Sequence, residues 1–379
     1  MLEKIKRCFA LEAVNTARQY EIDIARGFAI IFMVWVHVME EMDSFGSTIP
    51  HILVEYVLSE PFAAPVFLTT LGVGLVYSRH TSPKALLDRG INILVLGFLL
   101  NIVRFSLPII WDASLLNEPF PYVAVITWQI SVDVLQFAGL TFIYFSFAKK
   151  MGWSKSTLVM IAVLCSLLGT LLKGVTVDHY IGKQLLGYFW ASSDETFFPF
   201  LTWIIFPTFG YVFGSYWVKC RDKGSFYKLV SPAALILSCG YIAVCLIFGL
   251  SMYAEGNSYY HMNLLDACFI MMLMVGLFGL HYGLLQVFPR KIFTPLLSLS
   301  RNITEVYCIH WVILGFSWVC LKHFFGKTQL PFWEFTQYAF AILVISGFLA
   351  AFYNRELTLF KGGNLPVFLR RPRAIAAEK

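Results

Sequence analysis

Apolar segments long enough to cross a lipid bilayer recur along the whole chain. A transmembrane helix needs about 20 mostly apolar residues, and we count ten such segments in the 379-residue sequence. Inside a bilayer each segment can satisfy its backbone hydrogen bonds only as a helix. The sequence therefore predicts an all-α integral membrane protein, a bundle of about ten transmembrane helices. The predicted spans are residues 24–41, 61–78, 91–110, 124–148, 156–173, 197–217, 231–252, 263–284, 303–321 and 333–353.

The composition fits a membrane protein better than a soluble one. Hydrophobic residues make up 58% of the chain and charged residues 14%, whereas a soluble domain is about 25% charged. The net charge of +6 comes from short loops, where membrane topology explains it, so we expect no nucleic-acid partner. The eight cysteines form no CxxC pair, and we expect neither a disulfide framework nor a bound metal.

Lysine and arginine fall on one side of the predicted bundle. The basic residues gather in the loops that follow even-numbered spans, while the loops that follow odd-numbered spans are acidic. The positive-inside rule then places both termini in the cytoplasm, for a protein of the cell's inner or plasma membrane. We predict three parts: a cytoplasmic amphipathic lead-in (1–20), a single transmembrane domain (21–355) and a basic cytoplasmic tail (356–379).

The first predicted span carries ionisable groups at both ends of one face. The sequence from Asp23 to His37 reads DIARGFAIIFMVWVH, and every residue between Arg26 and His37 is apolar. The eleven-residue separation is almost three helical turns, so these two side chains share a face about 16 Å apart along the axis. Asp23 lies three residues before Arg26 and is placed to pair with it. This pattern predicts a helix that lines a cavity.

Polar residues also occur in the third and fourth spans. Arg104 lies deep in the third span, and Asp133 and Gln136 lie near the outer part of the fourth. Charges at membrane depth are costly and usually face a partner or a cavity. Asp133 and Gln136 are three residues apart and therefore share a helix face. Asp133 is a candidate to pair with Arg104 or to orient a histidine. For Arg104, structural pairing and substrate binding are both open.

The remaining candidates have two interpretations each. His37 is either a catalytic base or a hydrogen-bonded packing residue, and His51, in an outer loop, is either catalytic or simply solvated. His310 lies in mid-span, where an unpaired imidazole is expensive, and this favours a role facing a cavity. Arg301 precedes Glu305 by four residues and is placed to form a helix-stabilising pair.

Several of these segments together resemble the membrane-embedded acyltransferase superfamily. They are the D-x-x-R-G motif with R-x10-H formed by Arg26 and His37, PVFLTTLG at 65–72, DVLQFAG at 133–139, the segment 198–210 and SRNITEVYCIH at 300–310. Each is short, but their order and spacing agree over most of the chain. The resemblance implies that residues 21–355 form one transmembrane acyltransferase domain.

Two branches of the superfamily compete. The polysaccharide and peptidoglycan O-acyltransferase branch has the R-x10-H pair, seen here as Arg26 and His37. The branch resembling heparan-alpha-glucosaminide N-acetyltransferase has its active histidine in the loop after the first span, which corresponds to His51. That branch typically has an asparagine at the position of His37. Either histidine therefore remains a candidate for catalysis.

The resemblance implies transfer of an acyl group, most commonly acetyl, from cytoplasmic acetyl-CoA to a hydroxyl or amine of a glycan or another acceptor on the outer side. Arg26, with Arg79, Arg89 or Arg301, would bind the CoA phosphates. Asp23, Arg104 and Gln136 would complete the donor site. A histidine, His37, His51 or His310, would act as general base or carry the acyl group. An acid, Asp133 or Glu60, would fix its tautomer.

Two other functions fit the same polar residues. A proton-coupled secondary transporter of a small solute also combines intramembrane charges with buried histidines, but no internal repeat is visible in the sequence. A non-catalytic assembly subunit would tolerate replacement of each histidine. The small-xxx-small steps Gly210–Gly214 and Gly279–Gly283 are as compatible with the interface of a homodimer as with helix packing inside one chain. We expect membrane lipid to surround the helix bundle.

Overall fold

The computed structural model describes residues 2–42, 49–193, 196–250, 252 and 259–359. Within these ranges the chain is helical, and its one β-type contact is an isolated antiparallel bridge between Phe9 and Cys220. The prediction of an all-α membrane protein is confirmed to this extent.

Eight helical segments among the described residues are long and apolar enough to cross a membrane. They coincide with eight of the ten predicted spans. In five of them one helix covers the segment, and in the other three shorter helices follow each other. The segments are α2 (Tyr20–Glu41); α3 (Ile49–Ile52), η1 (Leu53–Ser59), α4 (Glu60–Phe62) and α5 (Ala64–Tyr77); α6 (Pro83–Asn101), η2 (Ile102–Ser106) and α7 (Leu107–Leu115); α8 (Tyr122–Ile130) and α9 (Val134–Lys150); α14 (Lys223–Phe248); α15 (Leu264–Val287); α17 (Ile303–Phe325); and α18 (Phe332–Leu359).

The other two predicted spans are shorter helices. The segment 156–173 forms α10 (Lys155–Leu171), which has 17 residues. The segment 197–217 forms α12 (Phe200–Trp203) and α13 (Ile205–Trp217), with a turn at Ile204 between them. Membrane-spanning helices have about 17 to 25 residues, so these two are at or below the lower limit. The count of ten spans and the cytoplasmic position of both termini stay predictions.

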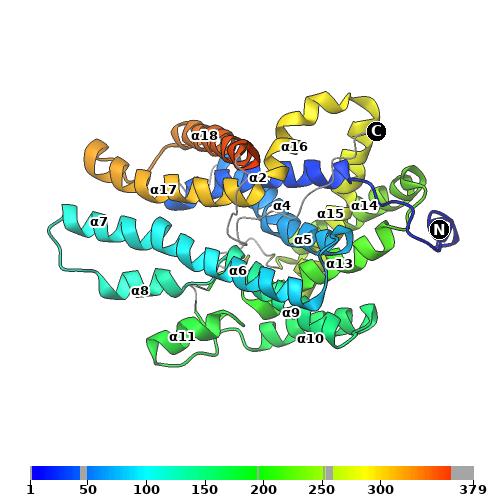
Figure 1. The fold of residues 1–379 in the computed structure, drawn as a ribbon, viewed down its shortest axis with the longest axis horizontal. Helices are drawn as coiled ribbons and strands as arrows, with labels where there is room; N and C mark the ends of the chain where they lie inside the picture. The colour runs from blue at the N-terminus through cyan, green and yellow to red at the C-terminus, as the bar shows by residue number, and fades with distance from the viewer. Residues whose placement is uncertain (1, 43–48, 194–195, 251, 253–258, 360–379) are drawn as a thin grey trace.

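Helix α2 occupies the centre of the bundle. It contacts α5, α15, α17 and α18, and the short α16 (Thr294–Arg301) packs across its first half. Figure 1 shows the long helices side by side along the long axis of the molecule, with α7, α8 and α11 (Tyr180–Gly187) at the end opposite the N-terminus. The central position explains why α2 carries buried residues on most of its faces.

One of the small-xxx-small steps forms a close helix contact. A Cβ atom at Gly210 of α13 would lie 1.9 Å from the carbonyl oxygen of Thr69 on α5. Only glycine allows this approach, as in membrane helix pairs joined through small residues. The prediction of packing at this step is confirmed, and the contact joins α13 to the segment that carries the second motif.

The chain before α2 is anchored to a loop far along the sequence. Helix α1 (Leu2–Arg7) is followed by an irregular segment that runs beside residues 218–222. The Ala10 amide donates to the Lys219 carbonyl at 2.8 Å, and the Arg221 amide donates to the Cys8 carbonyl at 2.9 Å. These bonds fix the segment that leads into α2.

The continuous helix assumed at Arg301 is wrong. Arg301 ends α16, and Asn302, at φ −109° and ψ 24°, separates it from α17. Glu305 lies in α17, so the i,i+4 geometry of one helix does not relate these two residues. The short 3-10 helix η4 (Arg290–Phe293) precedes α16, and together the two form a segment that covers the first half of α2.

Candidate active site

The two ends of α2 present different chemistry, as the sequence predicts. Asp23 forms an ion pair with Arg26, as expected, and a second one with Arg18. Arg26 Nε donates to Ser300 Oγ at 3.1 Å, and Ser300 Oγ lies 3.2 Å from Asp23 Oδ1. This network ties the start of α2 to α16.

Further cations lie at this end of the bundle that the sequence did not single out. The guanidinium groups of Arg18 and Arg290 lie 5.5 Å and 4.6 Å from the centroid of the Tyr20 ring. Lys223 Nζ donates to Glu21 at 2.9 Å. Arg301 follows Ser300 directly and therefore belongs to the same end. Guanidinium groups are the preferred partners of phosphate oxygens.

At its other end α2 brings His37 against His310 of α17. His37 Nδ1 lies 2.9 Å from His310 Nε2, and the rings are inclined by only 10°. His310 Nδ1 lies 3.0 Å from the carbonyl oxygen of Val306. Trp311 covers the His37 ring at 4.4 Å between centroids. The sequence singled out both histidines, but not their contact.

The tautomers of the pair follow from these partners. A carbonyl oxygen only accepts, so His310 Nδ1 carries a proton and donates to Val306. In a neutral His310 the other nitrogen, Nε2, is then an acceptor, and His37 must donate to it from Nδ1. A neutral His37 consequently keeps a free electron pair on Nε2. An imidazole held in this way is equipped to accept a proton from a substrate.

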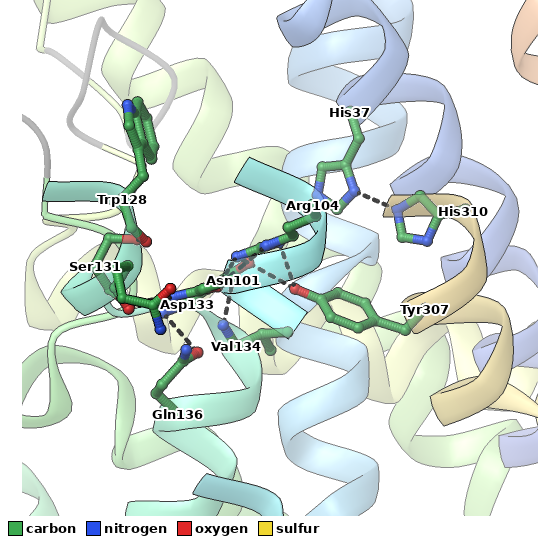
Figure 2. A network of polar contacts seen from close by, with 11 residues as sticks. His37, Asn101, Arg104, Trp128, Ser131, Asp133, Val134, Gln136, Tyr307 and His310 are labelled. Carbon is green, nitrogen blue, oxygen red and sulfur yellow. Dashed lines mark hydrogen bonds and ion pairs between the residues drawn. The ribbon is translucent and has the colours of Figure 1, made fainter. Parts of the chain in front are cut away.

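Beside the histidines lies a buried ion pair. Arg104 is 2% exposed, and its Nη2 lies 2.5 Å from Asp133 Oδ2. Tyr307 donates to the same carboxylate oxygen at 2.6 Å. The pairing of Asp133 with Arg104 is therefore confirmed. Figure 2 shows Arg104 between Asp133 and Tyr307, with the two histidines close by.

Other donors of Arg104 also have partners, and Nη1 donates to the Tyr307 hydroxyl at 3.4 Å. Nε and Nη2 donate to Asn101 Oδ1 at 3.2 Å and 3.0 Å, and the Asn101 amide donates to the Ser131 carbonyl at 3.1 Å. The guanidinium carbon lies 4.2 Å from the Phe105 ring and 4.5 Å from the Trp311 ring. A buried charge is tolerated when it is paired and hydrogen-bonded in this way.

Asp133 begins a helix instead of lying within one. Residues 131–133 are not helical, so the predicted fourth span is divided into α8 and α9. Asp133 Oδ1 accepts from the Val134 amide at 2.6 Å, and Gln136 Oε1 accepts from the Asp133 amide at 3.2 Å, as in a capping box. The inference that the two share a face of one helix is thus corrected: Gln136 caps Asp133.

Two π-helical segments contribute to this region. η1 carries Glu55 and Ser59, and η2 carries Arg104. Each extra residue in a wide turn shifts the following side chains around the helix, and such turns often occur at functional sites. η2 lies inside the predicted span 91–110 and η1 just before the span 61–78, and no local pattern indicates either wide turn.

These elements enclose a cavity of about 130 Å³ at the His37 end of α2. Its wall combines acidic, aromatic and small side chains. Polar groups on it are His37, Glu40, Glu55, Ser59, Glu60, Asp133, Tyr259, Tyr260 and Tyr307. Tyr260 lies outside the membrane-spanning segments. Burial and the nearby Glu40 raise the pKa of its phenol well above the ordinary value, so the phenol stays neutral and donates to Glu40 at 3.4 Å.

Most of the chain matches the model of one protein family. The model of a family described as an acyltransferase domain matches residues 19–351, which is most of the 379-residue chain. The chain belongs to this acyltransferase family. The match includes both ends of α2 and the His310 region. No curated protein matches the sequence.

This acyltransferase is an integral, multi-pass membrane protein with eight candidate spans among its described residues. The broader resemblance seen in the sequence is confirmed. The narrower likeness to the heparan-alpha-glucosaminide N-acetyltransferase branch stays a prediction.

His51 lies elsewhere in the acyltransferase. It is in α3, with its ring 5.2 Å from Phe332 and 5.8 Å from Phe335, and it is not among the residues that line the cavity. The structure brings together His37, Asp133, His310 and Arg104. It places Asp23, Arg26 and Arg301 at the opposite end of α2.

Sequence reasoning assigned no role to Tyr307, although this residue lies in the SRNITEVYCIH motif. It assigned none to Glu40 or Glu55 either, and Glu60 was only an alternative to Asp133. Glu40 lies three residues after His37 and so on the same face of α2, which was a visible signal. Glu60 was visible as a carboxylate before the PVFLTTLG motif. Glu55 and Tyr307 could not be placed, because their positions depend on a π-helical turn and on the approach of α17.

Proposed function

We propose that the protein transfers an acyl group, in the simplest case acetyl, from cytoplasmic acyl-CoA to a hydroxyl of an acceptor, such as a glycan, on the outer side of the membrane. Family membership supports the reaction type over the alternative of a proton-coupled transporter. The single observation that carries the proposal is the hydrogen-bonded chain from His37 through His310 to the Val306 carbonyl at the wall of a cavity.

In this mechanism His37 is the general base. Its Nε2 removes the proton from the acceptor hydroxyl while the oxygen attacks the thioester carbonyl. The acyl–sulfur bond then breaks, the acyl–oxygen bond forms, and the proton passes from His37 to the thiolate of CoA. No proton is gained or lost overall. When His37 is protonated, its Nδ1–H still donates to His310, so the ring keeps its orientation throughout.

The donor would enter from the Arg26 end. Arg18, Arg26, Arg290 and Arg301 lie there, and phosphate and guanidinium groups make strong charge-assisted hydrogen bonds. Arg26 and His37 are eleven residues apart on α2, which is about 16 Å along the axis. A pantetheine arm of similar length would connect nucleotide and thioester along this helix.

The test is single-turnover chemistry of the purified protein in detergent. Wild type is expected to bind acetyl-CoA and to consume it slowly. His37→Ala should bind acetyl-CoA equally well but turn over about 10²–10⁴-fold more slowly, the usual contribution of a general base. Arg26→Ala should instead weaken binding.

His51→Ala is the matched control, because it removes a histidine that does not line the cavity. Equal turnover in His51→Ala and wild type would support the assignment. Loss of turnover in His51→Ala with full activity in His37→Ala would transfer the catalytic role to His51 and refute this mechanism.

A further inference from the structure

Three glutamates of the cavity face one another without a counter-charge in its wall. Glu40 comes from α2, Glu55 from η1 and Glu60 from α4, and all three line the cavity together with His37. No lysine or arginine occurs among the described residues of this wall. Carboxylates withdrawn from water destabilise a protein unless a cation or hydrogen-bond donors compensate them.

The rest of the chain offers little compensation. Arg104, which lies beside the histidines, is engaged by Asp133, Asn101 and two aromatic rings. The sequence stretches that adjoin the lining residues, 38–60, 190–200 and 251–262, contain no lysine or arginine. Lysine and arginine are therefore absent from the described wall and from these three stretches.

Glu60 supplies an independent sign of a ligand. The residue is only 8% exposed, and its Oε2 is buried without a hydrogen-bond partner among the described residues. Because Glu60 also lines the cavity, this acceptor is positioned to receive a donor from a bound molecule. An unsatisfied buried acceptor is destabilising, and more so when it is charged. This cost is recovered when a ligand donates a hydrogen bond to it.

The cavity is also lined by aromatic residues. The Tyr259 and Tyr260 rings lie 5.0 Å apart, and Phe198 contacts Tyr260 edge-on at 5.2 Å. All three residues line the cavity. Aromatic faces attract cations, and the attraction grows when water is excluded. The acidic and the aromatic side chains of the cavity thus both favour a cationic group.

We propose that the cavity recognises its acceptor through a protonated primary amine, held by Glu60 with Glu40 and Glu55. An ammonium group has three donors, and three carboxylates provide their acceptors. The inference rests on the proposed function, since it describes the acceptor of the same reaction. It excludes acceptors whose recognised group is a phosphate or a carboxylate.

The amine is a recognition group and not the acylated group. Neighbouring carboxylates stabilise the charged form of an amine, so its electron pair stays occupied by a proton. The nucleophile is then a hydroxyl on the same molecule, activated by His37. The acceptor class is a hydroxyl-bearing amine, of which amino sugars and hydroxy amino acids are two sources.

The experiment compares ligands that differ at one group. Binding of glucosamine, glucose and N-acetylglucosamine to the full-length protein in detergent would be measured by calorimetry, with serinamide as the non-sugar source. We expect glucosamine to bind about tenfold or more tightly than glucose and N-acetylglucosamine. Tighter binding of serinamide than of glucosamine would indicate that the recognised amine belongs to a hydroxy amino acid and not to an amino sugar.

The preference should disappear in Glu60→Gln, which keeps the shape of the side chain and removes its charge. Glu55→Gln is the second variant, and it decides the question if Glu60→Gln does not fold. Glu334→Gln is the matched control, since Glu334 is exposed and pairs with Lys327. Equal binding of glucosamine and glucose by wild type, or an undiminished preference in the folded glutamine variants, would overturn the inference.

Failure of the proposed amine site is distinguishable from failure of the proposed acyl transfer. His37→Ala should keep the preference for glucosamine while it loses turnover of acetyl-CoA. A wild type that turns over acetyl-CoA in a His37-dependent way, but binds the three sugars equally, would refute only the amine site.

Discussion

At the scale of single residues, the contact of His37 with His310 decides which nitrogen of His37 is free. His310 acts on the reaction through His37 and is therefore a positioning residue. Its Nε2 accepts from His37 Nδ1 at 2.9 Å, and without that acceptor the neutral His37 ring is free to adopt the other tautomer. In that tautomer Nε2 carries the proton and is no longer a base.

His310→Ala should therefore lower the turnover of acetyl-CoA about 10-fold to 100-fold. This effect is larger than that of losing one hydrogen bond and smaller than that of losing a general base. Binding of acetyl-CoA should not change. His310→Gln, whose amide oxygen can accept from His37, should recover part of the rate, while His310→Leu should not. A rate in His310→Leu equal to that in His310→Gln would show that His310 serves only to fill space.

The buried pair of Arg104 and Asp133 governs stability more than binding. Removing one member leaves the other charge buried, which typically costs about 3–5 kcal/mol. Arg104→Gln and Asp133→Asn should each lower the midpoint of unfolding in detergent, and the double variant should be less destabilised than the sum of the two. Lys327→Gln, at an exposed pair with Glu334, should cost less than about 1 kcal/mol.

Strict additivity of the two changes in stability would contradict this coupling between Arg104 and Asp133.

The ion pair itself could be predicted, because a charge in a membrane span needs a partner and few are available. The histidine pair could not be predicted. Its members are 273 residues apart, and their contact depends on how α17 packs against α2, which no local pattern specifies.

At the scale of elements, the wide turn η2 depends on a close helix contact. A Cβ atom at Gly315 of α17 would lie 2.2 Å from the carbonyl oxygen of Arg104 in η2. Gly315→Ala should push α17 away from η2 and separate Tyr307 from Asp133. We expect a loss of about 1–3 kcal/mol in stability, as for other overpacked sites, together with reduced turnover of acetyl-CoA.

Gly240→Ala is the matched control for this change. A Cβ atom at Gly240 of α14 meets nothing within 4 Å, and alanine favours a helix over glycine, so stability should be unchanged or slightly higher. Equal behaviour of the two variants would refute the role assigned to the contact.

The long helices could be predicted because each must be apolar over about 20 residues. The interruptions inside them could not. The break at residues 131–133 and the π-helical turns η1 and η2 occur within apolar stretches, where hydropathy does not distinguish a helix from a wide turn. These interruptions place Glu55, Arg104 and Asp133, so the site was less predictable than the fold around it.

At the scale of the whole molecule, the two short segments α10 and α12–α13 decide the topology. If both cross the membrane, the chain has ten spans and residues 174–196 lie outside. If neither does, residues 151–222 all stay on one side and the chain has eight. Both arrangements have an even number of spans, so both place the two termini on the same side of the membrane. The side on which Asp178 lies distinguishes them.

The basic loops and the acidic loop 174–196 favour ten spans, and we therefore predict that Asp178 faces outward. The measurement is labelling of Asp178→Cys with a membrane-impermeant maleimide on intact cells, above the background of the native cysteines. Glu118→Cys should label from outside under either topology, and Met151→Cys only after permeabilisation. Labelling of Asp178→Cys only after permeabilisation would establish eight spans. In that case α10 and α12–α13 would dip into the membrane from the cytoplasmic side, and the acceptor side of the cavity would have to be closed by other segments.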